Sequence, residues 1–132
     1  MIDLKRVIDG EVEPPACDKT LGIQVKSANA GEAVCSWKVD ERFLNGHKVV
    51  MGGFITSAAD ITMAYSMGSI LDRNQGFASI NLQTTFLRPL QIGTAMIEST
   101  IVKKGRKTCY VEASVFQNGQ HVAKITSSIM IL

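Results

Sequence analysis

Asp60 is the residue of this sequence that most needs a chemical explanation. It lies in the mainly apolar stretch from Phe54 to Leu71, where Thr56 and Ser57 are nearly the only other strongly polar residues. An ionised carboxylate taken out of water costs several kcal/mol unless it is paired or hydrogen-bonded. No lysine or arginine lies three or four residues away, so its own helix supplies no cation. Its partner must come from elsewhere, and a satisfied structural carboxylate is the alternative to a functional one.

Gly52 and Gly53 lie at the expected start of the same helix, after a loop from Asn45. Glycine lets another group approach the backbone closely. The first N–H groups of a helix lack internal partners and carry partial positive charge, so they can hold a carbonyl oxygen as it becomes an oxyanion. The alternative is that the Gly-Gly pair only forms a tight turn before the helix. A donor and an acid on one helix favour chemistry at a carbonyl group.

The spacing of Gly53 and Asp60 indicates how they would cooperate. They are seven residues apart, which at about 1.5 Å per residue is roughly 10 Å along a helix axis. One small carbonyl group can hardly contact both. The simplest arrangement brings the helix start of one subunit near Asp60 of another, and a two-fold dimer does this twice. The sequence therefore predicts a homo-oligomer, a dimer or a tetramer.

Hydrophobic periodicity predicts the elements that position these residues. A short amphipathic helix is expected within 1–15, and two half-buried antiparallel strands follow, with alternating apolar residues at 21–25 and 33–39. The long helix occupies 54–71. Four strand-like runs come next, at 77–88, 94–103, 107–117 and 121–131, with hairpin turns at 104–106 and at Asn118-Gly119.

Consecutive strands joined by short turns pair antiparallel. A helix that is apolar on most sides must be enclosed by other elements. The expected class is therefore α+β, with one long central helix wrapped by a curved antiparallel sheet of about six strands. No repeat or linker divides the chain, so residues 1–132 are expected to form a single domain.

Composition narrows the function further. The chain has 45% hydrophobic and 20% charged residues, as soluble globular domains do. A net charge of +2 gives no reason to expect nucleic acid as a partner. Three cysteines without C-x-x-C spacing suit a reducing compartment, and no metal-ligand set or nucleotide-binding loop is visible. Because no secretory signal is present and Asp60 argues against a membrane span at 54–71, we expect a cytoplasmic protein without membrane contact.

Three motifs carry a resemblance to a known family: N-x6-G-G-x6-D at 45–60, S-I-N-L-Q-T-T-F-L-R-P at 79–89, and Gly105 followed by Arg106. From about Gly22 to its C-terminus the chain resembles the hotdog fold. Within that fold it is most similar to the small acyl-CoA thioesterases of the phenylacetate-pathway (PaaI-like) type. The resemblance implies a hydrolase that cleaves acyl-CoA or aryl-CoA thioesters to the free acid and CoA, without a metal or cofactor.

The same resemblance implies four catalytic residues. Asp60 would act as nucleophile or as general base on water, and the Gly53 amide would bind the thioester oxygen. Asn45 would help to fix the carbonyl group or the attacking water, with a loop-capping role as the alternative. Ser79 would position water or the carboxylate, with a plain strand hydroxyl as the alternative.

The expected substrate-binding residues form two groups. Met51 and Gly52 would lie beside the acyl group, where a flexible thioether tolerates varied chains. The phosphates of CoA would attract basic side chains. The residues expected near CoA are Arg88, Lys104, Gly105 and Arg106, although a solvated turn is the alternative for the cluster from Lys103 to Lys107.

One departure from the family pattern affects function. The family commonly has His-Gly-Gly, but this chain has Met51 before the two glycines, and Lys48 stands where the family often has glycine. Methionine cannot donate a hydrogen bond from its side chain. An acyl-CoA-binding protein without turnover is therefore the second hypothesis. A hotdog hydratase or dehydratase ranks last, because neither His47 nor His121 is suitably placed. The identity of the acyl group is not readable from the sequence.

Overall fold

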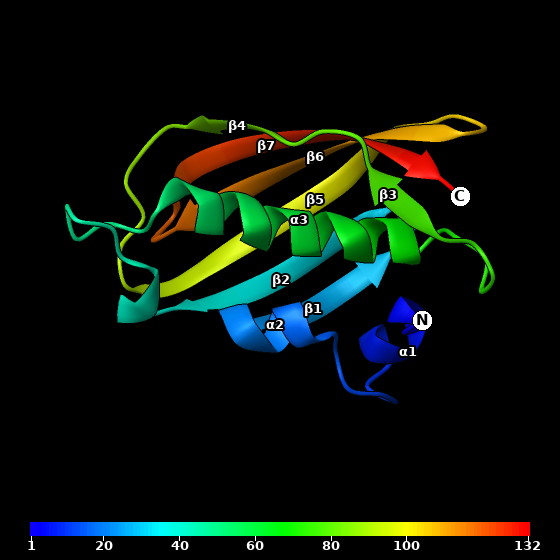
Figure 1. The fold of residues 1–132 in the computed structure, drawn as a ribbon, viewed down its shortest axis with the longest axis horizontal. Helices are drawn as coiled ribbons and strands as arrows, with labels where there is room; N and C mark the ends of the chain where they lie inside the picture. The colour runs from blue at the N-terminus through cyan, green and yellow to red at the C-terminus, as the bar shows by residue number, and fades with distance from the viewer.

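The computed structural model describes all 132 residues, and it consists of one long helix lying against one curved sheet (Figure 1). The helical elements are α1 (Leu4–Ile8), α2 (Ala16–Leu21), the short 3-10 helix η1 (Glu41–Phe43) and α3 (Gly52–Gly68). The strands are β1 (Ile23–Asn29), β2 (Glu32–Val39), β3 (Phe77–Ser79), β4 (Gln83–Phe86), β5 (Gly93–Lys104), β6 (Thr108–Gln117) and β7 (Gln120–Ile131).

The sheet is antiparallel throughout, in the order β1-β2-β5-β6-β7-β3, with β4 also paired to β7. β3 pairs with residues 129–131 of β7, and β4 pairs with residues 123–126. These two short strands therefore follow one another along the same edge. The seven strands fill six positions, which confirms the predicted sheet of about six strands.

The single strand predicted at 77–88 is wrong, because the chain bends between β3 and β4. Asn81 holds this bend onto β7. Its backbone carbonyl accepts a hydrogen bond from the Ser127 hydroxyl at 2.8 Å, and its side-chain carbonyl accepts one from the Ser128 N–H at 3.0 Å. The bend separates Ser79, at the end of β3, from the rest of the edge.

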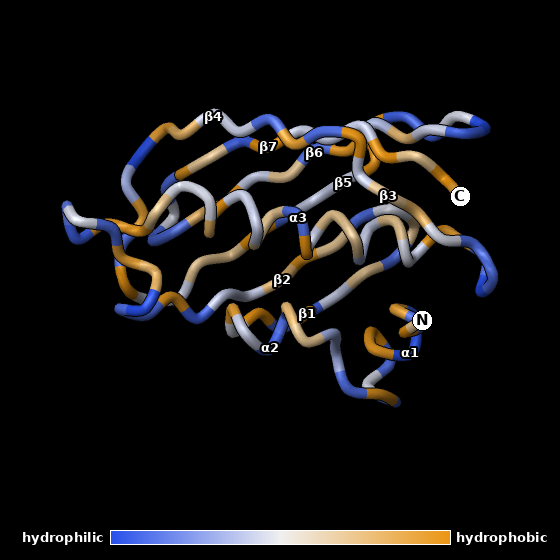
Figure 2. Tube along the Cα trace, in the orientation of Figure 1, coloured by the Kyte–Doolittle hydropathy of each residue, from blue (hydrophilic) through white to orange (hydrophobic).

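The core lies between α3 and the sheet. The alternation predicted for 33–39 is confirmed, since Ala33, Cys35, Trp37 and Val39 are all buried. Figure 2 shows hydrophobic residues along α3 and the strands, whereas the loops at both ends of the molecule are hydrophilic. None of the helices combines the length and hydropathy that a membrane span requires.

The apolar composition of α3 had predicted a helix enclosed by other elements, but one face of the helix is open. Nine of its residues are buried, at positions 55, 58, 59, 61–63 and 65–67. A stripe along the helix remains uncovered: Gly53 and Ser57 are exposed, and Asp60 and Ala64 are half-buried. These four residues share one face because side chains three and four positions apart lie above one another. The candidate donor and acid are thus both on the open face of the helix.

The helix boundaries differ from those expected. α3 begins at Gly52 and ends at Gly68 rather than running over 54–71. Its end is fixed by Ser69, whose hydroxyl donates to the Ser66 carbonyl at 2.8 Å and accepts from the Gly31 N–H at 2.9 Å. The predicted N-terminal helix is confirmed as α1, with Val7 buried. Ile2 precedes α1 and is 46% exposed.

α2 was not predicted, and it moves the start of the first strand from Leu21 to Ile23. Gly22 ends α2 in the left-handed conformation, with φ +79°. The predicted turn at Asn118-Gly119 is confirmed, because both residues have positive φ, +52° and +75°. Such φ values belong to the two-residue hairpin turns that match strand twist.

Candidate active site

Two unpaired N–H groups mark the N-terminal end of α3. The backbone N–H groups of Gly52 and Gly53 make no hydrogen bond within the chain. Gly53 is exposed to solvent. Such groups at a helix start carry partial positive charge and bind anions. Gly53 can therefore donate to an external oxygen, as the oxyanion hypothesis requires.

Two large side chains frame these donors. A Cβ atom on Gly52 would lie 2.6 Å from the ring of Phe86, so any other residue there would require that ring to move. A Cβ atom on Gly53 would lie 3.1 Å from the terminal methyl of Met51. Met51 and Phe86 are 45% and 52% exposed. Phe86 was missed by the sequence reasoning as a site residue, although its position within the F-L-R-P motif was visible.

Asp60 lies two turns further along the open face. Its carboxylate takes part in none of the chain's five ion pairs. Burial raises the pKa of Asp60, and an interaction with the Ser79 hydroxyl lowers that pKa in part. Partial desolvation without a cation makes the carboxylate a stronger base than a solvated aspartate. A side chain in this state suits proton abstraction from water or direct attack on a carbonyl carbon.

Ser79 is the neighbour that the fold gives to Asp60. It ends β3, one of the two short strands that pair with β7 at the edge of the sheet. The Ser79 hydroxyl lies close enough to the Asp60 carboxylate to lower its pKa, against the effect of burial. The structure therefore brings these two sequence-predicted residues together.

Asn45 caps the loop before α3. Its side-chain carbonyl accepts hydrogen bonds from the N–H groups of His47, at 2.9 Å, and Val49, at 3.4 Å. Its side-chain NH2 group makes no hydrogen bond within the chain and remains able to donate. In the single chain, Asn45 thus has the loop-capping role, and an additional contact to substrate stays a prediction.

Lys48 in this loop has φ +60°. This is the left-handed conformation that glycine adopts most readily. The conformation explains why a glycine suits this position in the family pattern. The bond from the Lys48 N–H to the Asn45 carbonyl, at 2.9 Å, closes the turn.

The predicted CoA-binding residues lie at opposite ends of the folded molecule. Arg88 belongs to the loop between β4 and β5, near the N-terminal end of α3, whereas Lys104, Gly105 and Arg106 form the β5–β6 hairpin at the other end (Figure 1). Gly105 is required there, because its N–H donates to the Thr108 carbonyl at 2.8 Å and a Cβ atom would lie 2.9 Å from that oxygen.

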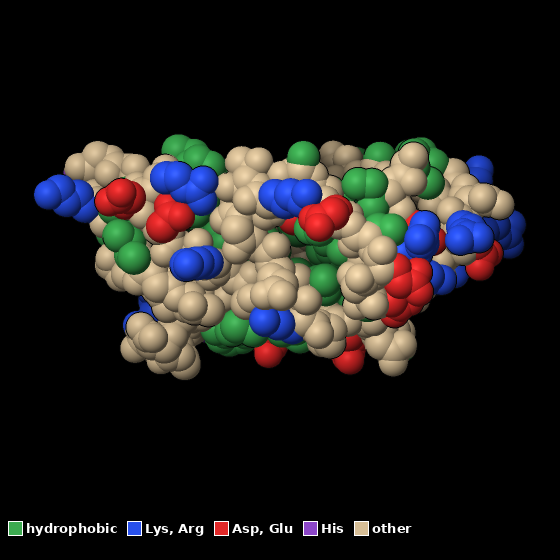
Figure 3. All heavy atoms as spheres, turned by 90° about the horizontal axis from the view of Figure 1, so that it is seen from below, with side chains coloured by type: hydrophobic (Ala, Val, Ile, Leu, Met, Phe, Trp, Pro, Cys, Tyr) green, Lys and Arg blue, Asp and Glu red, His purple; other side chains and the backbone are tan.

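Basic side chains gather at the hairpin end of the molecule (Figure 3). None of the four cations at residues 103, 104, 106 and 107 belongs to an ion pair. Four unpaired cations in five residues form a surface that attracts an anion such as a phosphate group. No cluster of three or more potential metal ligands occurs in the chain.

A single chain does not bring the predicted donor and acid into contact. Ser57 lies between them on the open face of α3, and its hydroxyl donates to the Gly53 carbonyl at 2.9 Å.

The neighbouring sheet edge is unpaired and carries exposed apolar side chains. They are Ile80 (54% exposed), Leu82 (38%), Phe86 (52%) and Leu87 (51%). An apolar free edge of this kind is a surface for association.

Comparisons with known proteins identify relatives of this architecture. The profile of the Thioesterase superfamily matches residues 47–124. The chain is 33% identical over 111 residues to the acyl-coenzyme A thioesterase PaaI of Escherichia coli K12, a match covering 82% of this chain and 76% of that protein.

Solved structures of other proteins are also similar to this chain. A phenylacetic acid degradation-related protein of Ralstonia eutropha JMP134 superposes with a TM-score of 0.92 at 28% identity, over 98% of this chain and 99% of that one. The PaaI protein of E. coli gives a TM-score of 0.87 at 26% identity, over 98% and 94% of the two chains.

Proposed function

Because this chain belongs to the thioesterase superfamily and has a hotdog fold, we propose that it hydrolyses acyl-CoA thioesters to the free acid and CoA. One observation carries the proposal: the open face of α3 combines an unpaired N–H at Gly53 with a desolvated carboxylate at Asp60. A donor and a base are the two groups that acyl transfer to water requires.

The chemistry assigns a role to each group. The Gly53 N–H holds the thioester oxygen as negative charge develops on it. Asp60 removes a proton from the attacking water, whose oxygen forms the new bond to the carbonyl carbon. The carbon–sulfur bond then breaks, and the proton passes to the departing thiolate. In the nucleophilic route the Asp60 carboxylate attacks the carbonyl carbon first, the carbon–sulfur bond breaks and CoA leaves as the thiolate. Water then cleaves the resulting anhydride, which releases the free acid, regenerates the carboxylate and supplies the proton for the thiolate.

A complete site needs two chains. Gly53 and Asp60 are separated by roughly 10 Å along α3, so we propose that the Gly53 of one subunit faces the Asp60 of its neighbour. Two-fold pairing creates two such sites at once. The free edge at β4, with its exposed Phe86, supports this pairing because it lies beside α3, where the Thr84 hydroxyl is 2.6 Å from the Thr56 hydroxyl.

The remaining predicted residues complete the proposal. The free NH2 group of Asn45 contacts the thioester carbonyl or the attacking water, and Ser79 orients the Asp60 carboxylate. The phosphates of CoA meet Lys104 and Arg106 at the β5–β6 hairpin, where Gly105 keeps the turn tight, or Arg88 at the other end. A cytoplasmic location suits such a substrate, and the three cysteines are all free.

Binding of acyl-CoA without turnover is the second candidate function. Met51 favours it, because this side chain occupies the family histidine position beside Gly53 and cannot donate a hydrogen bond. A backbone donor does not depend on that side chain, so hydrolysis remains the first candidate.

A panel of aliphatic and aromatic acyl-CoAs tests the choice. CoA release is measured with a thiol reagent for the native protein and for Asp60→Asn, and binding is measured by calorimetry. We expect turnover by the native protein that disappears in the variant. Tight binding of acyl-CoAs with no turnover by native protein would instead establish the binding function.

A further inference from the structure

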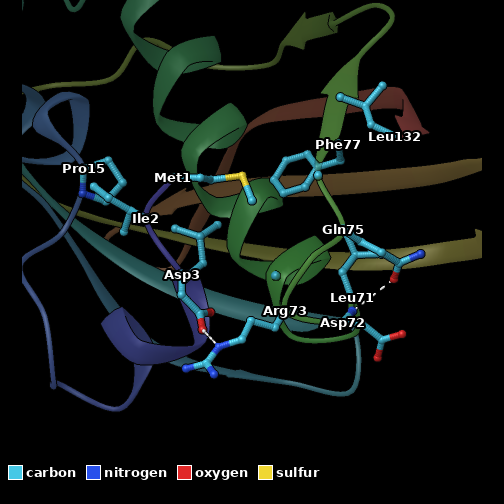
Figure 4. A pocket seen from close by; sticks show the side chains of 13 residues that line it. Met1, Ile2, Asp3, Pro15, Leu71, Asp72, Arg73, Gln75, Phe77 and Leu132 are labelled. Atoms are coloured by element: carbon cyan, nitrogen blue, oxygen red, sulfur yellow. Dashed lines mark hydrogen bonds and ion pairs between the residues drawn. The ribbon is translucent and has the colours of Figure 1, made fainter.

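A cavity of about 430 Å³ lies at the C-terminal end of α3 (Figure 4). Its walls are mainly apolar, and its polar side chains include Asp3 and Arg73, which form an ion pair at 3.7 Å. The volume lies within the range of small-molecule sites, roughly 300–1,000 Å³. The apolar lining residues are Met1, Ile2, Leu4, Pro15, Leu71, Phe77 and Leu132.

The cavity is continuous with the open face of α3. Ala64 lies one turn beyond Asp60, and Gly68, which lines the cavity, lies one turn beyond Ala64. β3 runs beside this stripe. Ser79 acts on Asp60, and Phe77, two residues earlier and therefore on the same side of the strand, lines the cavity. Helix and strand together lead from the carboxylate to the cavity.

The N-terminal segment closes the far wall. Leu4 packs against Gly68 so closely that a Cβ atom on the glycine would lie 2.8 Å from the Leu4 Cβ. Asp3 caps α1 by accepting a hydrogen bond from the Lys5 N–H at 3.0 Å. Residues 1–4 lie outside the region that matches the family profile, which begins at residue 47. The cavity is thus built partly from a segment outside the matched profile.

We propose that this cavity receives the distal part of the substrate's acyl chain, and that medium-chain aliphatic acyl-CoAs are the preferred substrate class. The proposal rests on the thioesterase function proposed above. The carbonyl group lies at Asp60, the chain passes Ala64 and Phe77, and the terminal carbons lie among Ile2, Leu71 and Leu132.

The distance from Asp60 to the cavity is what selects medium-chain acyl groups. Eight residues separate Asp60 from Gly68, which is roughly 12 Å of helix. An extended chain advances roughly 1.2 Å per bond, as a polypeptide does over its three bonds per residue. About ten carbons therefore span the distance. A phenylacetyl group ends about five bonds from its carbonyl carbon, near Ala64, and does not enter the cavity.

The number of acyl methylenes buried in the cavity sets the size of the expected preference for longer acyl-CoAs. Each methylene removed from water favours binding roughly fourfold. Chains of up to about six carbons end near Ala64, before the cavity, and gain nothing there. We expect kcat/KM to rise steeply between hexanoyl-CoA and decanoyl-CoA, and to fall once the chain exceeds the length of the cavity.

Ile2→Trp tests the assignment, because Ile2 lines the cavity but is 46% exposed and can be enlarged without disturbing the core. The variant should lower kcat/KM for decanoyl-CoA at least about tenfold while changing that for acetyl-CoA less than about twofold. Ile92→Trp is the matched control, since Ile92 is 57% exposed and lies away from the cavity. It should leave both substrates unchanged.

Binding to catalytically inactive protein provides a second readout. In an Asp60→Asn background, calorimetry should show decanoyl-CoA binding more tightly than acetyl-CoA, and Ile2→Trp should remove most of that difference. Hydrolysis with equal effects of Ile2→Trp on all chain lengths would overturn the cavity assignment alone. If native protein hydrolyses no acyl-CoA, the thioesterase function and the substrate class fail together.

Discussion

The two ends of α3 both depend on glycine, in opposite ways. At the N-terminal end, Gly52 and Gly53 keep the backbone accessible, so two N–H groups stay unpaired beneath Phe86 and Met51. At the C-terminal end, Gly68 lets Leu4 approach until α1 closes an apolar cavity. One end presents polar backbone, and the other encloses apolar space.

This difference matches the two halves of a thioester substrate. The reacting carbonyl needs donors and a base, and the acyl chain needs a dry apolar wall. Asp60 lies between the two ends, half-buried on the open face of α3. Under the proposed pairing, Asp60 and the cavity beside one helix serve the same site, whereas the Gly53 of that helix serves the site of the neighbouring subunit.

Asp60→Asn should have the largest effect. The amide has nearly the shape of the carboxylate but neither its basicity nor its charge, so we expect kcat to fall at least ~100-fold. Asp9→Asn, at an exposed acid beside α1, is the matched control and should change kcat little. Steady-state kinetics on decanoyl-CoA provide the measurement. An Asp60→Asn variant that keeps native kcat would remove the residue from the mechanism.

The pH dependence of kcat/KM should report the environment of Asp60. Burial raises the pKa of this carboxyl, so activity is lost as pH falls through a value above the ordinary aspartate pKa of about 3.9. The Ser79 hydroxyl lowers the same pKa, so Ser79→Ala should move this acidic limb to higher pH. A limb that stays in place would show that Ser79 does not act on the carboxylate.

The same raised pKa has a consequence for stability. The folded protein binds the Asp60 proton more tightly than the unfolded chain does, so this residue's contribution to stability falls as pH rises from the unfolded pKa to the folded pKa. At neutral pH, Asp60→Asn should therefore raise Tm. The difference should shrink as pH falls through the folded pKa, which thermal melts at several pH values can follow.

Met51→His should change the N-terminal end only modestly. Because the oxyanion contact comes from the Gly53 backbone, the side chain at position 51 can alter substrate preference or rate by roughly tenfold or less. Kinetics on two acyl-CoAs of different bulk check this. If native protein is inactive on every thioester and Met51→His creates turnover of ~1 s⁻¹, within the ordinary enzyme range, the native chain is a binding protein.

Substituting alanine for glycine at each end of α3 should change the free energy of unfolding in opposite directions. At Gly68 the new Cβ would meet Leu4 at 2.8 Å, and we expect a loss of about 1–3 kcal/mol in the free energy of unfolding. At Gly53 it would meet only the flexible end of Met51, and the helix gains up to about 1 kcal/mol. Equal effects in chemical denaturation would contradict the contrast.

Local patterns predicted much of this fold. The alternation from Ala33 to Val39 identified the buried face of β2, and Asn118-Gly119 identified the β6–β7 turn. Asp60 was recognisable because a lone carboxylate in an apolar helix is unusual. Ser79 followed from the family resemblance, and the structure places it beside Asp60.

The missed features depend on contacts between distant residues. α2 is six residues long, too short for a periodic pattern. It is held by hydrogen bonds from the Tyr65 hydroxyl to the Asp18 carboxylate and from the Trp37 indole to the Leu21 carbonyl. The bend between β3 and β4 depends on Asn81 binding β7. The cavity depends on α1 packing against Gly68, which no local signal encodes.

Subunit mixing tests most directly whether the donor and the acid come from different chains. Asp60→Asn and Gly53→Val, each inactive alone, are unfolded and refolded together in equal amounts, with different tags to quantify hybrids. Random two-fold pairing makes half of the dimers hybrid, each with one intact site of two, so about a quarter of native activity should return. Hybrids that form without any recovery of activity would show that Gly53 and Asp60 do not act across the subunit interface.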